Sequence, residues 1–143
     1  MKKSNTFVII IFGLYTFLIL LLNVSNKFST YFINNIIYLL SKMNVGYDYL
    51  DLISKIIYYF ILYIPYGAIV FSFSANVFEK KLYVFAFTIL CILFVVLIST
   101  LIQSIKYEYD ALVPILKISF AYIGFLVSYL SLYIRVNKKN KKN

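Results

Sequence analysis

The chain has 143 residues, of which 63% are apolar and 13% are charged, and its mean hydropathy is +0.89. A composition this rich in apolar residues excludes a soluble globular domain. The net charge of +9 would favour nucleic-acid binding in a soluble protein, but here the Lys and Arg residues lie mostly beside the apolar runs, as topogenic charges do. We predict an integral membrane protein of one domain, residues 1–143, that binds membrane lipids and no nucleic acid.

The first apolar run covers about residues 6–24 and follows Lys2 and Lys3. At about 1.5 Å per residue it is long enough to cross a hydrocarbon core of about 30 Å. The run is too long for the apolar core of a secretory signal, and no small-residue cleavage site follows it. We predict a retained transmembrane helix whose basic start is cytoplasmic.

Residues 28–43 form a second, weaker helical pattern. Apolar residues recur at helical spacing, but Asn34, Asn35 and Lys42 interrupt them, and the apolar run is too short to span a membrane. We predict an amphipathic helix in the outer interface. A re-entrant segment and a packed connector are the alternatives.

The second spanning helix is predicted over residues 53–75. Asp51 precedes it at the right spacing to pair with Lys55. Pro65 lies inside the run and predicts a kinked helix, and Gly67 favours close approach of a neighbouring helix. A stripe of tyrosines in this run is typical of helix packing and, in part, of an interfacial aromatic belt.

Two further spanning helices complete an all-α, four-span architecture, over residues 82–102 and 111–134, with a basic disordered tail at 135–143. Most Lys and Arg residues lie in the N-terminal segment, the link near Lys80 and the tail, whereas all acidic residues except Glu79 lie in the other two loops. The positive-inside rule then predicts a multi-pass protein of the cell membrane with both termini cytoplasmic.

Polar residues cluster where the third apolar run ends and the fourth begins. Because ionisable groups are costly at membrane depth, this cluster is the candidate ligand-binding site. Its predicted members are Gln103, Glu108, Asp110 and Lys117. Two interpretations of Lys117 stay open: its stem snorkels to the interface, or it faces the bundle and pairs with Asp110 or Glu108. For Gln103, a hydrogen bond between helices is the simpler role.

Few residues in the chain suit catalysis or metal binding. The chain has one cysteine, Cys91, and no histidine, so an internal disulfide is impossible and a metal cluster is not expected. The neighbouring carboxylates of Glu108 and Asp110 have no nucleophile beside them, and loop carboxylates are usually solvated. We predict no catalytic residues, no metal and no cofactor.

Two segments of the chain resemble the VanZ-like family of small membrane proteins from Gram-positive bacteria. The family carries a helix with a pattern like F-I-P-F-G, and this chain has Tyr63-Ile64-Pro65-Tyr66-Gly67. Further on, Gln103 matches the family's Gln, Tyr109-Asp110 matches its Phe-Asp, and Gly124 matches the second glycine of its last helix. Several family positions differ: Thr100 replaces Glu, Val113 replaces the second acid, Lys117 replaces Asn, and Phe120 replaces the first glycine.

The resemblance implies a protein that affects the susceptibility of the cell envelope to glycopeptide and lipoglycopeptide antibiotics such as teicoplanin. The antibiotic or a lipid-linked envelope component would be its partner. The alternative is a non-catalytic accessory or immunity subunit of a membrane transporter or envelope complex. In that case the helix faces around Gly67 and Gly124 would pack against a membrane-protein partner.

Overall fold

The computed structural model describes residues 6–24, 26–42, 47–106 and 110–140. These residues form an all-α fold of five helices, and no strand occurs among them. The helices are α1 (Thr6–Val24), α2 (Asn26–Ser41), α3 (Tyr47–Val77), α4 (Lys81–Lys106) and α5 (Leu112–Asn140). Four of them, all except α2, are long and apolar enough to cross a membrane, which confirms the predicted class of polytopic membrane protein.

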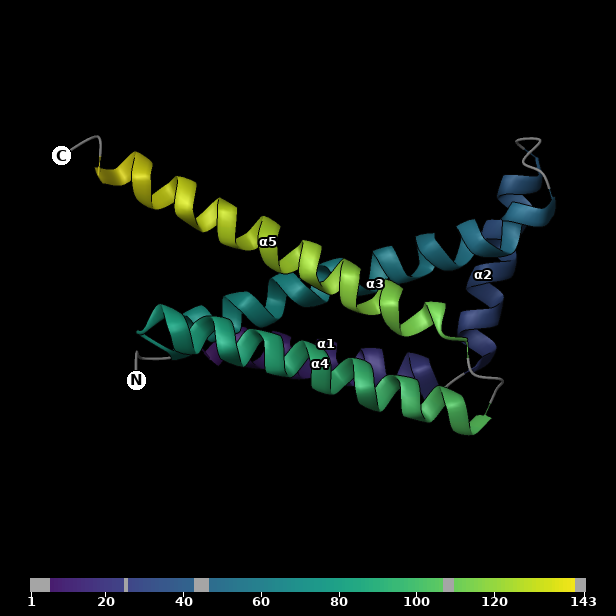
Figure 1. Ribbon diagram of the computed structural model, residues 1–143, viewed down its shortest axis with the longest axis horizontal. Coiled ribbons are helices and arrows are strands. Elements are labelled where there is room, and N and C mark those ends of the chain that lie inside the picture. The colour runs from purple at the N-terminus through teal and green to yellow at the C-terminus, as the bar shows by residue number, and fades with distance from the viewer. Residues whose placement is uncertain (1–5, 25, 43–46, 107–109, 141–143) are drawn as a thin grey trace.

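The four long helices run roughly along one direction, and α2 lies across one end of them (Figure 1). The beginning of α1 and the end of α5 lie toward the opposite end, as an even number of spans requires (Figure 1). The end of the bundle at which α1 and α4 finish is called the Lys117 end. The opposite end is called the terminal end. The crosswise position of α2 favours an interfacial helix over a re-entrant segment.

Two helices extend beyond the predicted spans. Helix α3 begins at Tyr47 instead of residue 53, and its first turns are held by a 2.8 Å ion pair between Lys55 and Asp51, as the spacing predicted. Helix α5 continues to Asn140, so the predicted disordered tail is helical over residues 135–140, and residues 141–143 lie outside the described residues. In both cases, the polar residues that end the apolar run in the sequence do not end the helix in the structure.

The closest helix contact is between α3 and α5, and two glycines make it possible. A Cβ atom on Gly67 would collide with the backbone carbonyl of Ala121, and one on Gly124 would collide with the carbonyl of Ile64. The two backbones therefore approach directly, each glycine lying against the other helix. In the structure, Gly67 and Gly124 each pack against a helix of the same chain.

Pro65 lies inside α3, beside this crossing. Because proline has no N–H, the carbonyl of Ile61 lacks its usual helical hydrogen bond. In the same turn of α3, the hydroxyl of Tyr15 from α1 donates to the carbonyl of Leu62 at 3.0 Å. This hydrogen bond ties α1 to the segment of α3 that proline weakens.

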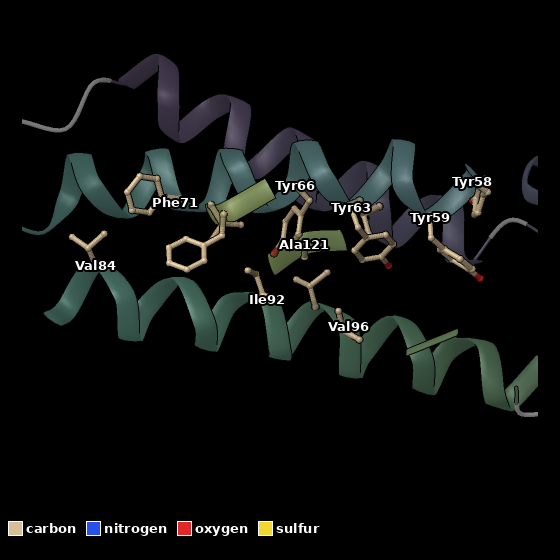
Figure 2. Packing of buried hydrophobic residues seen from close by; sticks show 13 residues of the cluster. Tyr58, Tyr59, Tyr63, Tyr66, Phe71, Val84, Ile92, Val96 and Ala121 are labelled. Atoms are coloured by element: carbon tan, nitrogen blue, oxygen red, sulfur yellow. The ribbon is translucent and has the colours of Figure 1, made fainter. Parts of the chain in front are cut away.

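The core lies mainly between α3 and α4. Figure 2 shows side chains of α3 and α4 pointing toward one another, among them Tyr63, Tyr66, Ile92 and Val96, with Ala121 of α5 beside them. Tyr63 and Tyr66 are fully buried. These two tyrosines serve packing, as predicted for the stripe, and do not form an interfacial belt.

Candidate functional site

The only fully buried ionic side chain among the described residues is Lys117, in the second turn of α5. Its Nζ donates to Gln103 Oε1 at 2.8 Å, to Ser99 Oγ at 3.0 Å and to Asn23 Oδ1 at 3.1 Å. Three acceptors thus use all three N–H donors of the ammonium. We call Lys117, Asn23, Ser99 and Gln103 the Lys117 cluster.

The helices supply these acceptors from their ends. Asn23 lies in the last turn of α1, and Gln103 lies in the last turn of α4. A helix carries partial negative charge at its C-terminus, so two helix ends favour a cation at this place. The Nζ also lies 5.6 Å from the ring centroid of Tyr59 and 5.9 Å from that of Tyr63, both on α3. Aromatic faces attract cations within this distance.

The cluster continues into a second shell of hydrogen bonds. The Tyr63 hydroxyl lies 3.2 Å from Ser99 Oγ and 3.5 Å from Asn23 Nδ2. Asn23 and Ser99 also donate to carbonyls of their own helices, those of Ile19 and Val96. All four long helices therefore contribute a side chain to one buried network, and each acceptor of Lys117 is held in position.

No carboxylate among the described residues lies within ion-pair distance of Lys117. Asp110 bonds instead to Lys55 of α3, with 3.2 Å between Oδ2 and Nζ. Its other oxygen accepts the backbone N–H of Leu112 at 3.0 Å, so Asp110 caps α5. Lys55 thereby joins Asp51 and Asp110 and fixes the beginning of α5 to α3.

The structure brings together some of the predicted site residues and separates others. Gln103 and Lys117 are in contact, through the hydrogen bond between helices that was predicted for Gln103. Snorkelling of Lys117 is contradicted by its complete burial, and pairing with Asp110 is contradicted by the bond of Asp110 to Lys55. Glu108 lies outside the described residues.

Sequence reasoning missed two members of the cluster, Asn23 and Ser99. Neither residue was predicted as a member of the site. Asn23 is 5% exposed and is 94 residues from Lys117 in the chain. The one signal in the sequence was an amide inside the last turn of an apolar helix, where a buried polar group requires a partner.

Comparison with protein-family models, with curated proteins and with solved structures gives no match. The resemblance to the VanZ-like family therefore stays a prediction from the motifs. Thr100 occupies the position of the family's Glu, and its Oγ1 is buried without a hydrogen-bond partner. This orphan hydroxyl lies one helical turn before Gln103.

Proposed function

We propose that this chain is a non-catalytic protein of the bacterial cell membrane that lowers susceptibility to lipoglycopeptide antibiotics such as teicoplanin. The observation that carries the proposal is the burial of Lys117 on oxygens from α1 and α4 at one end of the bundle. A polar network inside a membrane bundle is costly and marks a functional site by default. Gln103, which bonds Lys117, is also a position shared with the VanZ-like motif.

The orientation of the chain belongs to the same proposal. Both ends of the described chain lie at the terminal end (Figure 1). In the sequence, most Lys and Arg residues belong to the segments that begin and end the chain and to the link between α3 and α4. The positive-inside rule then makes the terminal end cytoplasmic. The Lys117 end consequently faces the outer surface, where glycopeptides and lipid-linked wall precursors are found.

The test compares a sensitive Gram-positive host with and without the chain, at matched expression measured on membranes. We expect the chain to raise the minimal inhibitory concentration of teicoplanin severalfold, with little change for vancomycin. Lys117→Met should abolish this effect, because methionine keeps the side-chain volume and removes the donors. Leu90→Met is the matched control, because Leu90 is 65% exposed on the outside of α4.

Unchanged susceptibility to both drugs with folded protein in the membrane would contradict the proposal. Equal protection by the Lys117→Met variant would contradict the role of the cluster alone.

One observation favours the second candidate, an accessory subunit of a membrane complex. A cleft of about 470 Å³ lies between α3 and α5 toward the terminal end, and four of its lining residues are polar: Ser72, Asn76, Ser128 and Ser131. The last part of α5 diverges from the other long helices (Figure 1). A transmembrane helix of a partner would fill this cleft and bond its hydroxyls.

The two candidates predict different sensitive positions. In the accessory-subunit candidate, Ser128→Leu should fill the cleft and release a stoichiometric partner during purification, whereas Leu90→Met should retain it. The faces around Gly67 and Gly124 were the predicted partner surface, but they are closed against each other within the chain. Retention of the partner by Ser128→Leu would contradict this candidate.

A further inference from the structure

When Lys117 is protonated, only dipoles compensate the charge of its ammonium. Its three acceptors are neutral oxygens, and no carboxylate among the described residues lies within ion-pair distance. A buried charge normally has a counter-ion, because dipoles recover only part of the lost hydration. Among the described residues, the protonated cluster therefore has a positive charge without a counter-ion.

The neighbours of Lys117 are also able to serve an anion. The hydroxyls of Ser99, Tyr59 and Tyr63 and the amides of Asn23 and Gln103 donate as well as accept hydrogen bonds. Asn23 and Ser99 already donate to the carbonyls of Ile19 and Val96, and Tyr63 bonds Ser99. The Gln103 amide and the Tyr59 hydroxyl are therefore the neighbours that keep a donor for a second ligand. Thr100 Oγ1, buried without a partner one turn from Gln103, adds another hydroxyl nearby.

One side of the cluster leads outward. Asn23, Ser99 and Lys117 are buried, but Gln103 is partly exposed, so a route from the surface to Lys117 would pass this amide. Lys55 lies one turn before Tyr59 on α3, and the Tyr59 ring centroid is 5.6 Å from Lys117 Nζ, so the ion pair of Lys55 and Asp110 is near the same end of the cluster. Lys55 and Asp110 are 32% and 39% exposed at their side chains, so the pair lies at the surface.

We propose that the Lys117 cluster is the closed form of a site for a phosphate group at the Lys117 end. When Asp110 releases Lys55, the Lys55 ammonium keeps its pair with Asp51 and faces the route, and the phosphate is held between Lys55 and Lys117 with the Gln103 amide as a third donor. Two ammonium groups and neutral donors match the charge and acceptor oxygens of a phosphate. The inference rests on the proposed function, because it names the ligand class of the same site.

The phosphate has two sources, a lipid head group or a free anion, and the probes separate them. The protein is purified in an uncharged detergent, and its melting temperature is measured with short-chain phosphatidylglycerol, with short-chain phosphatidylcholine and with inorganic phosphate at constant ionic strength. At saturating probe we expect a rise of about 5 °C with phosphatidylglycerol. A rise with inorganic phosphate as well would identify the phosphate alone as the recognised group.

Three variants test the assignment. Lys117→Met should abolish the rise, and Gln103→Leu should reduce it and serves if Lys117→Met does not fold. Asp110→Asn should increase the rise, because asparagine keeps the cap on α5 and frees Lys55 from Asp110, which leaves Lys55 paired with Asp51 alone. Lys42→Met is the control, since Lys42 is an exposed lysine beside α2 whose ammonium lies over the Tyr38 ring.

An equal rise in the wild type and in Lys117→Met, or no rise with either phosphate probe, would overturn the inference. An equal rise with phosphatidylcholine would do the same, because it would mark a response to acyl chains. These outcomes are independent of the antibiotic test. Teicoplanin protection that requires Lys117 without any phosphate response would leave the proposed function standing and remove only the ligand class.

Discussion

The two ends of the bundle are held together by different means. At the Lys117 end, the ammonium of Lys117 on α5 donates hydrogen bonds to side chains of α1 and α4. The ion pair of Lys55 and Asp110 joins the beginning of α5 to α3. At the terminal end, the described residues include a buried 3.0 Å bond between the side chains of Thr88 and Ser74 and contacts of aromatic rings such as Phe85 and Tyr129. Directional bonds fix positions more tightly than ring contacts, so the Lys117 end is suited to a preorganised site and the terminal end to a partner.

The crossing of α3 and α5 separates these two ends, and breaking it should have the largest effect. Gly67→Ala places a methyl group against the Ala121 carbonyl, so the two backbones must separate. We expect a loss of about 3 kcal/mol in the free energy of unfolding, the upper part of the usual range for overpacking. The melting temperature of the purified protein measures it.

Gly13→Ala is the matched control for this substitution. Nothing lies within 4 Å of the added Cβ at Gly13, and alanine is the better helix former. The control should therefore be neutral or stabilising. A similar loss in both variants would contradict the direct contact of α3 and α5.

A substitution that destabilises one end of the helix bundle should leave the contacts at the other end unchanged. Lys117→Met leaves the oxygens of Asn23, Ser99 and Gln103 without their donor, at a cost of about 2 kcal/mol. Thr88→Val removes the bond at the terminal end and should cost about 1 kcal/mol. Only Lys117→Met should remove teicoplanin protection at equal protein levels, so protection lost equally in both variants would refute a functional difference between the ends.

Gln103→Glu sharpens the description of the Lys117 end. The new carboxylate lies beside the ammonium, and a charge-assisted bond is stronger than a neutral one, so stability should increase by about 1 kcal/mol. The same carboxylate should abolish the response to inorganic phosphate, since it supplies the missing counter-charge. Increased stability with an unchanged phosphate response would separate the two claims and contradict the second.

Asp110→Asn should have the smallest effect on stability, about 0.5 kcal/mol, because the ion pair with Lys55 is partly exposed and the cap is kept. Asp51→Asn, on the other side of Lys55, is the comparison. We expect Asp110→Asn alone to change ligand response, as measured by the melting temperature with phosphatidylglycerol. An equal response to phosphatidylglycerol in Asp110→Asn and Asp51→Asn would contradict the role of the bond between Lys55 and Asp110 in ligand binding.

The helices of this chain were predictable from its sequence because apolar runs of spanning length leave few alternatives. The ends of the helices were not predictable. Helix α5, for example, continues through polar residues at which the hydropathy pattern indicates the end of a span. The crossing at Gly67 and Gly124 was predictable as a tendency of small residues to pack, but not which helices would meet.

The candidate site was predictable only in part, for a related reason. Gln103 and Lys117 stood out because they are polar near long apolar runs. Their partner Asn23 is on the first helix, and no local pattern connects residues that far apart in the chain. The pairing of Asp110 with Lys55 instead of Lys117 likewise depends on how α3 and α5 meet.

The central claim is that Lys117 is held inside the bundle and does not extend to the surface. The most direct measurement is labelling of the protein in lipid nanodiscs with a membrane-impermeant amine-reactive ester, followed by peptide mass spectrometry. We predict rapid modification of Lys42 and none of Lys117 until the protein is denatured. Modification of Lys117 at the rate of Lys42 would contradict the buried cluster and restore the snorkelling interpretation.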